Sequence, residues 1–329
     1  AVWQQACPSC LIALLPYCLA AVNDSASTFR RLSFDLRDGQ MAGLAFGGAS
    51  ANPDIVFLHA TGFNAMTYRT LLAPLGERFH VWALDARGHG RSTLKASTFG
   101  YSSWYRHRDD VIAVLEKHCT APVTLAGHSM GATVSLLTAG KRTDLVSGLA
   151  LIEPVILPAA GYAFSQLPLG PLIQRHTMPL ATGAAKRRDA FESRAAALTA
   201  FTGRGMFKTF PPEVVADYVE DGLCDDGAGG FRLSCRPQFE AATYCAQRHD
   251  PWSALRKVTD PMVLLRAEKN STITEAAMHR IAAINPHARV ATVEGASHML
   301  PMERPDRARA AIESAAMMAQ AGRKYHGME

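Results

Sequence analysis

The chain of 329 residues lacks the features that mark several classes of protein. Its formal net charge is only +5, and its densest basic cluster, residues 186–188, is followed by Asp189 and Glu192. This pattern predicts a solvated helix face rather than a nucleic-acid surface. The seven cysteines are odd in number and irregularly spaced, which favours reduced thiols over a disulfide framework. Cys7 and Cys10 form a CxxC with no second pair, so no metal or redox site is predicted.

Apolar runs of membrane-spanning length are also missing. Residues 9–22 have the length of a signal-peptide core but are too few to cross a bilayer, and no Lys or Arg precedes Arg30. Residues 1–28 are therefore interpreted as an N-terminal apolar helix or a segment upstream of the domain, with periplasmic export left open. We expect a cytoplasmic protein with no membrane span and no nucleic-acid partner. The sequence predicts no oligomeric state.

What the chain does contain is an alternation of strand-like and helix-like segments. Residues 29–37 and 40–47 flank Asp38-Gly39 and predict a β-hairpin. Six apolar runs typical of buried strands follow, at residues 54–60, 79–86, 122–127, 148–154, 261–267 and 288–295. Apolar residues recur at helical spacing in residues 66–77, 104–118, 130–142 and 275–284. The pattern predicts an α/β fold with a mostly parallel, doubly wound sheet.

Ser129 lies in the sequence "GHSMG", between a predicted strand and a predicted helix. A strand, a sharp turn and a helix are the elements of a nucleophile elbow. Gly127 and Gly131 carry no side chains, so the two backbones can approach closely around a strained turn. The N-terminus of the helix also favours negative charge beside the serine. These features favour Ser129 as a nucleophile.

Four motifs together resemble the α/β-hydrolase family over about residues 29–320. They are "HATGFN", "DARGHGRS", "GHSMG" and "GASHMLPMERP", after the third, fourth, fifth and last predicted strands. Residues 203–223 further resemble poorly characterised bacterial members. The resemblance implies a core of residues 29–153 and 251–329 and an inserted helical cap of residues 154–250. Within the cap we expect helices in residues 185–203, 211–223 and 236–249, entered through a Pro/Gly-rich hinge at residues 157–174.

A serine nucleophile needs a base, and twelve histidines compete for that role. The resemblance implies His298, which lies on the loop after the final strand, where the family places its catalytic histidine. His59, His89 and His128 lie within or beside the other motifs. We expect these three to shape or brace the loops rather than to take part in proton transfer.

The third member of a triad is where the sequence departs from the commoner family pattern. The usual aspartate position after the seventh strand holds Asn270, or Ser271 if the loop is shifted, and neither can stabilise an imidazolium by charge. Glu153 follows the sixth strand, and some relatives place their acid there. Because active groups gather at the carboxyl ends of such strands, we predict Glu153 as the acid. Glu268 remains the rival.

The resemblance implies an oxyanion hole made by the backbone N–H groups of Met130 and Thr61. Gly62 or Phe63 would replace Thr61 if the loop is shifted, and Phe63 is also expected to contact substrate. The expected reaction is cleavage of a small apolar carboxylic ester or lactone through a Ser-His-Glu acyl-enzyme mechanism, with no metal or organic cofactor. Carbon–carbon bond hydrolysis, thioester cleavage, acyl transfer and non-catalytic ligand binding stay open.

Overall fold

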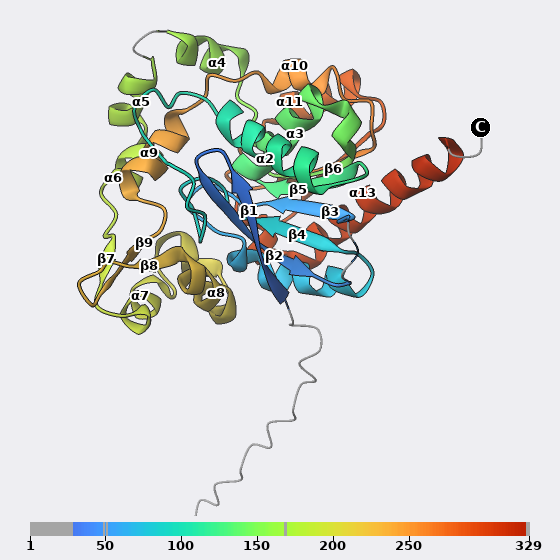
Figure 1. The fold of residues 1–329 in the computed structure, drawn as a ribbon. Coiled ribbons are helices and arrows are strands. Elements are labelled where there is room, and N and C mark those ends of the chain that lie inside the picture. The colour runs from blue at the N-terminus through green and yellow to red at the C-terminus, as the bar shows by residue number, and fades with distance from the viewer. Residues whose placement is uncertain (1–28, 49, 51, 168–169, 327–329) are drawn as a thin grey trace, which may run out of the picture.

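The computed structural model describes residues 29–48, 50, 52–167 and 170–326 (Figure 1). The predicted N-terminal segment, with Cys7 and Cys10, lies outside the described residues. The four cysteines inside them, Cys119, Cys224, Cys235 and Cys245, are free thiols. Within this described part of the chain, no helix combines the length and the apolar character needed to cross a membrane.

An eight-stranded sheet runs through the centre of the molecule, in the order β1-β2-β4-β3-β5-β6-β10-β11. Its strands are β1 (Phe29–Leu36), β2 (Gly39–Phe46), β3 (Ile55–Leu58), β4 (Val81–Leu84), β5 (Val123–His128), β6 (Val146–Ile152), β10 (Met262–Ala267) and β11 (Ala288–Val293). The β1–β2 and β2–β4 pairs are antiparallel and the others are parallel. All eight predicted strands and the mostly parallel sheet are confirmed.

Helices cover both faces of the sheet, which is why its inner strands are apolar throughout. In β3, Ile55 and Phe57 belong to one buried cluster while Val56 and Leu58 belong to the other, because alternate side chains point to opposite faces. One face is covered by α2 (Tyr105–His118), α3 (Met130–Lys141), α10 (Pro251–Leu255) and α11 (Glu275–Ile284). The other is covered by α1 (Arg69–Leu72), α12 (Leu300–Glu303) and α13 (Pro305–His326).

The predicted helix at residues 66–77 is broken into three pieces: η2 (Met66–Tyr68), α1 and η3 (Ala73–Glu77). Pro74 has no N–H to continue the hydrogen-bonding of α1, which accounts for the change to a 3₁₀ turn. A further 3₁₀ turn, η4 (Thr143–Leu145), precedes β6.

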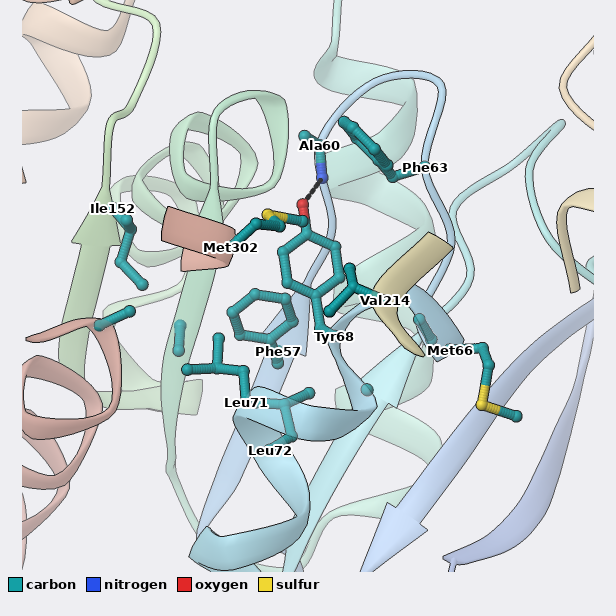
Figure 2. Packing of buried hydrophobic residues seen from close by; sticks show 14 of the residues in the cluster. Phe57, Ala60, Phe63, Met66, Tyr68, Leu71, Leu72, Ile152, Val214 and Met302 are labelled. Atoms are coloured by element: carbon teal, nitrogen blue, oxygen red, sulfur yellow. Dashed lines mark hydrogen bonds between the residues drawn. The ribbon is translucent and has the colours of Figure 1, made fainter. Parts of the chain in front are cut away.

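Tyr68 lies at the centre of the core beneath the loop that follows β3 (Figure 2). Its ring packs against Phe57 with the ring centroids 4.8 Å apart, and both side chains are fully buried. The Tyr68 hydroxyl accepts a hydrogen bond of 3.2 Å from the backbone N–H of Ala60. The hydrophobic core therefore holds the first residues of this loop in place.

Residues 154–250, which we call the inserted segment, separate β6 from β10. They contain α4 (Ala159–Gln166), α5 (Gly170–Thr177), α6 (Pro179–Ala185), α7 (Arg194–Phe201), η5 (Gly205–Thr209), α8 (Pro212–Gly222) and α9 (Pro237–Cys245). A small antiparallel sheet joins β7 (Ala190–Phe191), β9 (Phe231–Leu233) and β8 (Leu223–Asp225). This sheet was not predicted. The predicted hinge at residues 157–174 is also wrong, because α4 and most of α5 lie within it.

The predicted solvated helix face at residues 186–188 is confirmed only in part, because Lys186 and Arg188 are exposed, whereas Arg187 is partly buried and the helix is absent. These residues lie between α6 and β7, outside any helix. Arg187 donates to Glu240 Oε2 at 2.7 Å and to the Tyr218 hydroxyl at 2.8 Å, and Glu240 is almost fully buried. The central cation of the basic cluster is thus neutralised inside the inserted segment, where an unpaired buried charge would be costly.

Candidate active site

In the part of the chain that the structure describes, three residues other than glycine have positive φ angles, and all three follow the carboxyl ends of neighbouring strands. Ser129 follows β5 with a φ of 54°, Glu153 follows β6 with a φ of 50°, and Asn270 follows β10 with a φ of 52°. Such conformations cost about 1–3 kcal/mol each and gather at functional sites. Because β5, β6 and β10 are adjacent and parallel, the three turns meet at one edge of the sheet.

The turn at Ser129 depends on glycines at two positions. The Ser129 N–H donates to the Ile152 carbonyl at 3.0 Å, and α3 begins at the next residue. A Cβ on Gly131 would collide with the carbonyl oxygen of Leu58, and one on Gly127 would lie 2.5 Å from the carbonyl carbon of Gly131. The close approach of strand and helix that the sequence predicted is therefore present, and it positions Ser129 at the N-terminus of α3.

The structure brings Ser129, His298 and Glu153 into one chain of hydrogen bonds. His298 Nδ1 lies 2.9 Å from Glu153 Oε2, and His298 Nε2 lies 3.0 Å from Ser129 Oγ. A carboxylate only accepts hydrogen bonds, so Nδ1 of a neutral His298 carries the proton and Nε2 accepts from the serine hydroxyl. The Glu153 side chain is fully buried, whereas that of His298 is 21% exposed and faces the site.

Glu153 is surrounded by hydrogen-bond donors from β10 and the loop after it. Its Oε1 accepts from the Ala267 N–H and from Ser271 Oγ at 2.7 Å, and its Oε2 accepts from the Thr272 N–H at 3.2 Å. Together with His298 these donors compensate the burial of a charged carboxylate. Ser271, which occupies the region where the commoner pattern has an acid, is thus a partner of Glu153.

Glu268, the rival acid, makes a different contact. Its side chain is exposed, and its Oε2 accepts a 2.7 Å hydrogen bond from the Gly295 N–H. Within the described residues it makes no hydrogen bond or ion pair with His298. Asn270, in the same loop between β10 and α11, lines the cavity described below.

The sequence left three N–H groups of the loop after β3 as alternative oxyanion donors, and two of them are already used inside the protein. The Gly62 N–H donates to His89 Nε2 at 3.0 Å, and the Phe63 N–H donates to the Ala60 carbonyl at 3.1 Å. The Thr61 N–H has no partner among the described residues. The Thr61 hydroxyl donates to Met130 Sδ at 3.3 Å, which places Thr61 beside the first residue of α3. Of the alternatives left open by the sequence, Thr61 is the available donor.

Two buried histidines brace this loop. His59 accepts from the Ala86 N–H at 2.9 Å through Nε2, so its Nδ1–H donates to the Ala60 carbonyl at 2.7 Å. His89 accepts from Gly62 through Nε2 and donates through Nδ1 to the Arg87 carbonyl at 2.9 Å. Burial lowers the pKa of His59 to about 3 and the pKa of His89 to about 4, which keeps both rings neutral.

A second hydrogen-bonded chain connects the loop after β3 to the loop that carries His298. His128 Nε2 donates to the His298 carbonyl at 2.8 Å, and His128 Nδ1 accepts from the Tyr68 hydroxyl at 2.8 Å. The same hydroxyl accepts from the Ala60 N–H. Burial, reinforced by the neighbouring His298, holds the pKa of His128 well below its usual range. Sequence reasoning missed Tyr68, because no local pattern marks a residue whose partners are distant in the chain.

A cavity of about 320 Å³ opens onto Ser129 and His298. Its wall is mainly apolar, with contributions from both the core and the inserted segment: Phe63, Val155, Leu157, Met178, Met206 and Met299. Phe63 is nearly buried and stacks on Phe210 with the ring centroids 6.0 Å apart. Among the described residues that line the cavity there is no Lys, Arg, Asp or Glu. No group of three or more potential metal-ligating side chains occurs in the described part of the chain.

Comparison with known proteins places the chain in a family. The model of the alpha/beta hydrolase family matches residues 55–311, which is most of the chain, and the chain therefore belongs to that family. The α/β-hydrolase fold inferred from the four motifs is confirmed, and the protein is a hydrolase.

Individual relatives differ in the activity for which they are named. A 2-(acetamidomethylene)succinate hydrolase of Mesorhizobium japonicum is 26% identical over 256 residues, covering 78% of this chain and 85% of the relative. Esterase Rv0045c of Mycobacterium tuberculosis is 30% identical over 122 residues, 37% of this chain and 38% of that protein. Two solved structures share the fold. The first is an E-2-(acetamidomethylene)succinate hydrolase, with a TM-score of 0.72 and 24% identity, covering 88% of this chain and 99% of that one. The second is a thioesterase domain from the curacin biosynthetic pathway, with a TM-score of 0.70 and 16% identity, covering 87% of this chain and 99% of that one.

Proposed function

We propose that this hydrolase cleaves a carboxylic ester or lactone through an acyl-enzyme formed on Ser129. The observation that carries the proposal is the hydrogen-bonded chain from Ser129 Oγ through His298 to Glu153. Each member has the environment its role requires: the serine borders the cavity, the histidine lies between cavity and interior, and the carboxylate is buried among donors. Hydrogen bonds of this kind are what nucleophilic catalysis by serine needs.

In the proposed mechanism, His298 Nε2 takes the proton from Ser129 Oγ as the oxygen attacks the carbonyl carbon of the substrate. Glu153 holds Nδ1 protonated and stabilises the imidazolium that forms. The N–H groups of Thr61 and Met130 bind the oxyanion. His298 then gives its proton to the leaving alkoxide, and a water molecule activated by the same Nε2 releases the acyl group from Ser129.

The cavity favours a neutral substrate over the dianion implied by the name of one relative. A succinate carries two carboxylates, and transferring them from water into a mainly apolar cavity is costly without a compensating cation. No lysine or arginine lines the cavity among the described residues. This argues for an uncharged ester or lactone with an apolar acyl or alkyl part.

A fluorophosphonate probe tests the assignment of Ser129 directly. We expect stoichiometric labelling of the folded protein, loss of labelling in Ser129→Ala, and a matched loss of turnover on a panel of p-nitrophenyl esters. Ser135, buried in the same helix, provides the control, and Ser135→Ala should still be labelled. Absence of labelling in the folded wild type would refute the acyl-enzyme and leave non-catalytic ligand binding as the better reading.

A further inference from the structure

A buried carboxylate of the inserted segment lies directly against the loop that carries the proposed oxyanion donor. Glu240, in α9, is only 1% exposed. A Cβ on Gly62 would lie 2.6 Å from Glu240 Oε1, so the Glu240 side chain packs on the Cα of Gly62 and leaves no room for a larger residue. Because Gly62 directly follows Thr61, this contact bears on the position of the Thr61 N–H.

Residues 60–63 form a tight turn that sets the direction of the Thr61 N–H. The Phe63 N–H donates to the Ala60 carbonyl at 3.1 Å, and Gly62, the third residue of the turn, has a φ of 80°. A positive φ at this place is typical of a type II turn and favours glycine. The Ala60 carbonyl and the Thr61 N–H belong to one trans peptide unit and point in opposite directions. The bond that closes the turn therefore directs the Thr61 N–H away from the turn.

The core and the inserted segment hold this turn at different points. Core side chains bind the N–H groups of Ala60 and Gly62, as described above. The inserted segment contacts the turn through Glu240, which packs on the Gly62 Cα, and through Phe210, which stacks on Phe63 with the ring centroids 6.0 Å apart. Without these two contacts, a glycine of wide conformational freedom would stand beside the donor residue with support from the core alone.

Two donors fix the carboxylate of Glu240 in this place. Arg187 donates to Oε2 at 2.7 Å, and the Tyr244 hydroxyl donates to Oε1 at 3.2 Å. Arg187 also donates to the Tyr218 hydroxyl at 2.8 Å. An unpaired carboxylate beside the oxyanion would oppose the charge that develops on the substrate, whereas the pair with Arg187 is neutral overall. The ion pair therefore supports Gly62 without adding a net charge.

We propose that Glu240 is a positioning residue for the oxyanion hole, and that the Glu240–Arg187 ion pair makes the hole depend on the docking of the inserted segment. This role rests on the proposed acyl-enzyme function and adds a means of regulating it, because a displacement of α9 would release Gly62 and weaken oxyanion binding by the Thr61 N–H. Substrate binding should change less, since Glu240 is not among the residues that line the cavity. The expected signature is a loss in kcat rather than a rise in KM.

The double variant Glu240→Ala/Arg187→Met removes the support for Gly62 without leaving a buried charge unpaired. We expect kcat for p-nitrophenyl esters to fall about 10- to 100-fold, with KM changed by less than about 3-fold. An alkyl trifluoromethyl ketone supplies a second measurement. Ser129 Oγ adds to its carbonyl carbon, His298 takes the serine proton, and the carbonyl oxygen becomes an oxyanion in the hole. Its inhibition constant should rise by about the same factor as kcat/KM falls.

Arg69 and Asp217 supply the matched control. They form another ion pair between the core and the inserted segment, at 3.0 Å, and in the described chain neither side chain hydrogen-bonds to residues 60–64. The variant Asp217→Ala/Arg69→Met should therefore lose stability and keep both kcat and the inhibition constant. Glu240→Gln keeps the shape of the support, so it should retain kcat within about 5-fold of the wild type.

Several results would overturn the role of Glu240: a folded Glu240→Ala/Arg187→Met with the wild-type inhibition constant, an equal loss of inhibitor affinity in the control pair, or a Glu240→Gln as impaired as the double variant. If the double variant does not fold, Phe210→Leu loosens the same turn at Phe63 and should raise the inhibition constant; an unchanged value there would overturn the dependence on the inserted segment. Failure of the wild type to hydrolyse any ester, together with absence of fluorophosphonate labelling, would instead show that the proposed function is wrong.

Discussion

Replacing Glu153 with glutamine changes one oxygen to an NH₂ group in a fully buried site. The donors around the carboxylate decide how the new amide lies. Oε1 accepts from the Ala267 N–H, so the amide oxygen is expected there, and the NH₂ group then faces His298 Nδ1. An NH₂ group donates to Nδ1, which moves the imidazole proton to Nε2. His298 would then present a proton, instead of a lone pair, to the Ser129 hydroxyl.

The expected loss combines this wrong tautomer with the removal of a charge that stabilises the imidazolium. Together these changes should lower kcat/KM by roughly 10²- to 10⁴-fold, or about 3–5 kcal/mol of transition-state stabilisation. Full burial of the Glu153 side chain removes solvent screening and favours the upper part of this range. Glu268→Gln should change kcat/KM by no more than about 2-fold, because its exposed amide oxygen can still accept from the Gly295 N–H.

The assay is the rate of p-nitrophenolate release under pre-steady-state conditions, which separates acylation from deacylation. Each variant also needs a thermal melt, since Glu153 ties together β6 and the loop after β10. A folded Glu153→Gln that keeps near-wild-type acylation would contradict the role assigned to this carboxylate. If Glu268→Gln were inactive at the same time, the acid would be Glu268 despite its distance from the hydrogen-bonded chain.

Two further predictions concern the support of the site. Tyr68→Phe removes the hydroxyl that hydrogen-bonds to both Ala60 and His128, so kcat should fall about 5- to 50-fold with a smaller change in KM. The control variant Tyr105→Phe should leave both kcat and KM unchanged. A loss of stability in Tyr68→Phe without a change in kcat would show that Tyr68 has a structural role only. The folded-state pKa values of His59 and His89 lie below the value of about 6.5 expected in the unfolded chain. The contribution of these two neutral histidines to the free energy of unfolding is therefore complete above about pH 6.5 and is lost as the pH falls below it. Urea unfolding should therefore show a loss of about 1 kcal/mol for each residue between about pH 7 and about pH 5.5, and a flat profile would refute it.

The sheet could be predicted because the signal for each strand, its pattern of apolar residues, lies within the strand itself. Buried parallel strands need apolar side chains on both faces, and each of the eight runs shows this or the alternation of a hairpin. The sequence also predicted the residues that meet at the site, since Ser129, Glu153 and His298 each directly follow or closely follow a strand end. Their hydrogen bonds could not be predicted, because these depend on the directions of side chains that follow three different strands, β5, β6 and β11.

The inserted segment was harder to predict for two physical reasons. Prolines were interpreted as breaks, yet Pro158 caps the start of α4 and Pro171 lies in the first turn of α5, where a missing N–H costs nothing. Arg187 was interpreted as solvated because its neighbours in sequence are charged. Its actual partners, Glu240 and Tyr218, are distant in the chain, so the pattern around residue 187 contains no record of them.

Strand order explains how an acid after β6 can replace the usual one after β10. In the sheet, β6 lies between β5 and β10, so Glu153 is one strand away from Ser129 on one side and next to the β10 loop on the other. That loop no longer needs a carboxylate of its own, and Ser271 and Thr272 instead donate hydrogen bonds to Glu153. A second carboxylate at that place would lie against the first and oppose its ionisation. Ser271, which occupies the usual acid position only if the loop is shifted by one residue, is thus one of the donors that compensate the burial of Glu153.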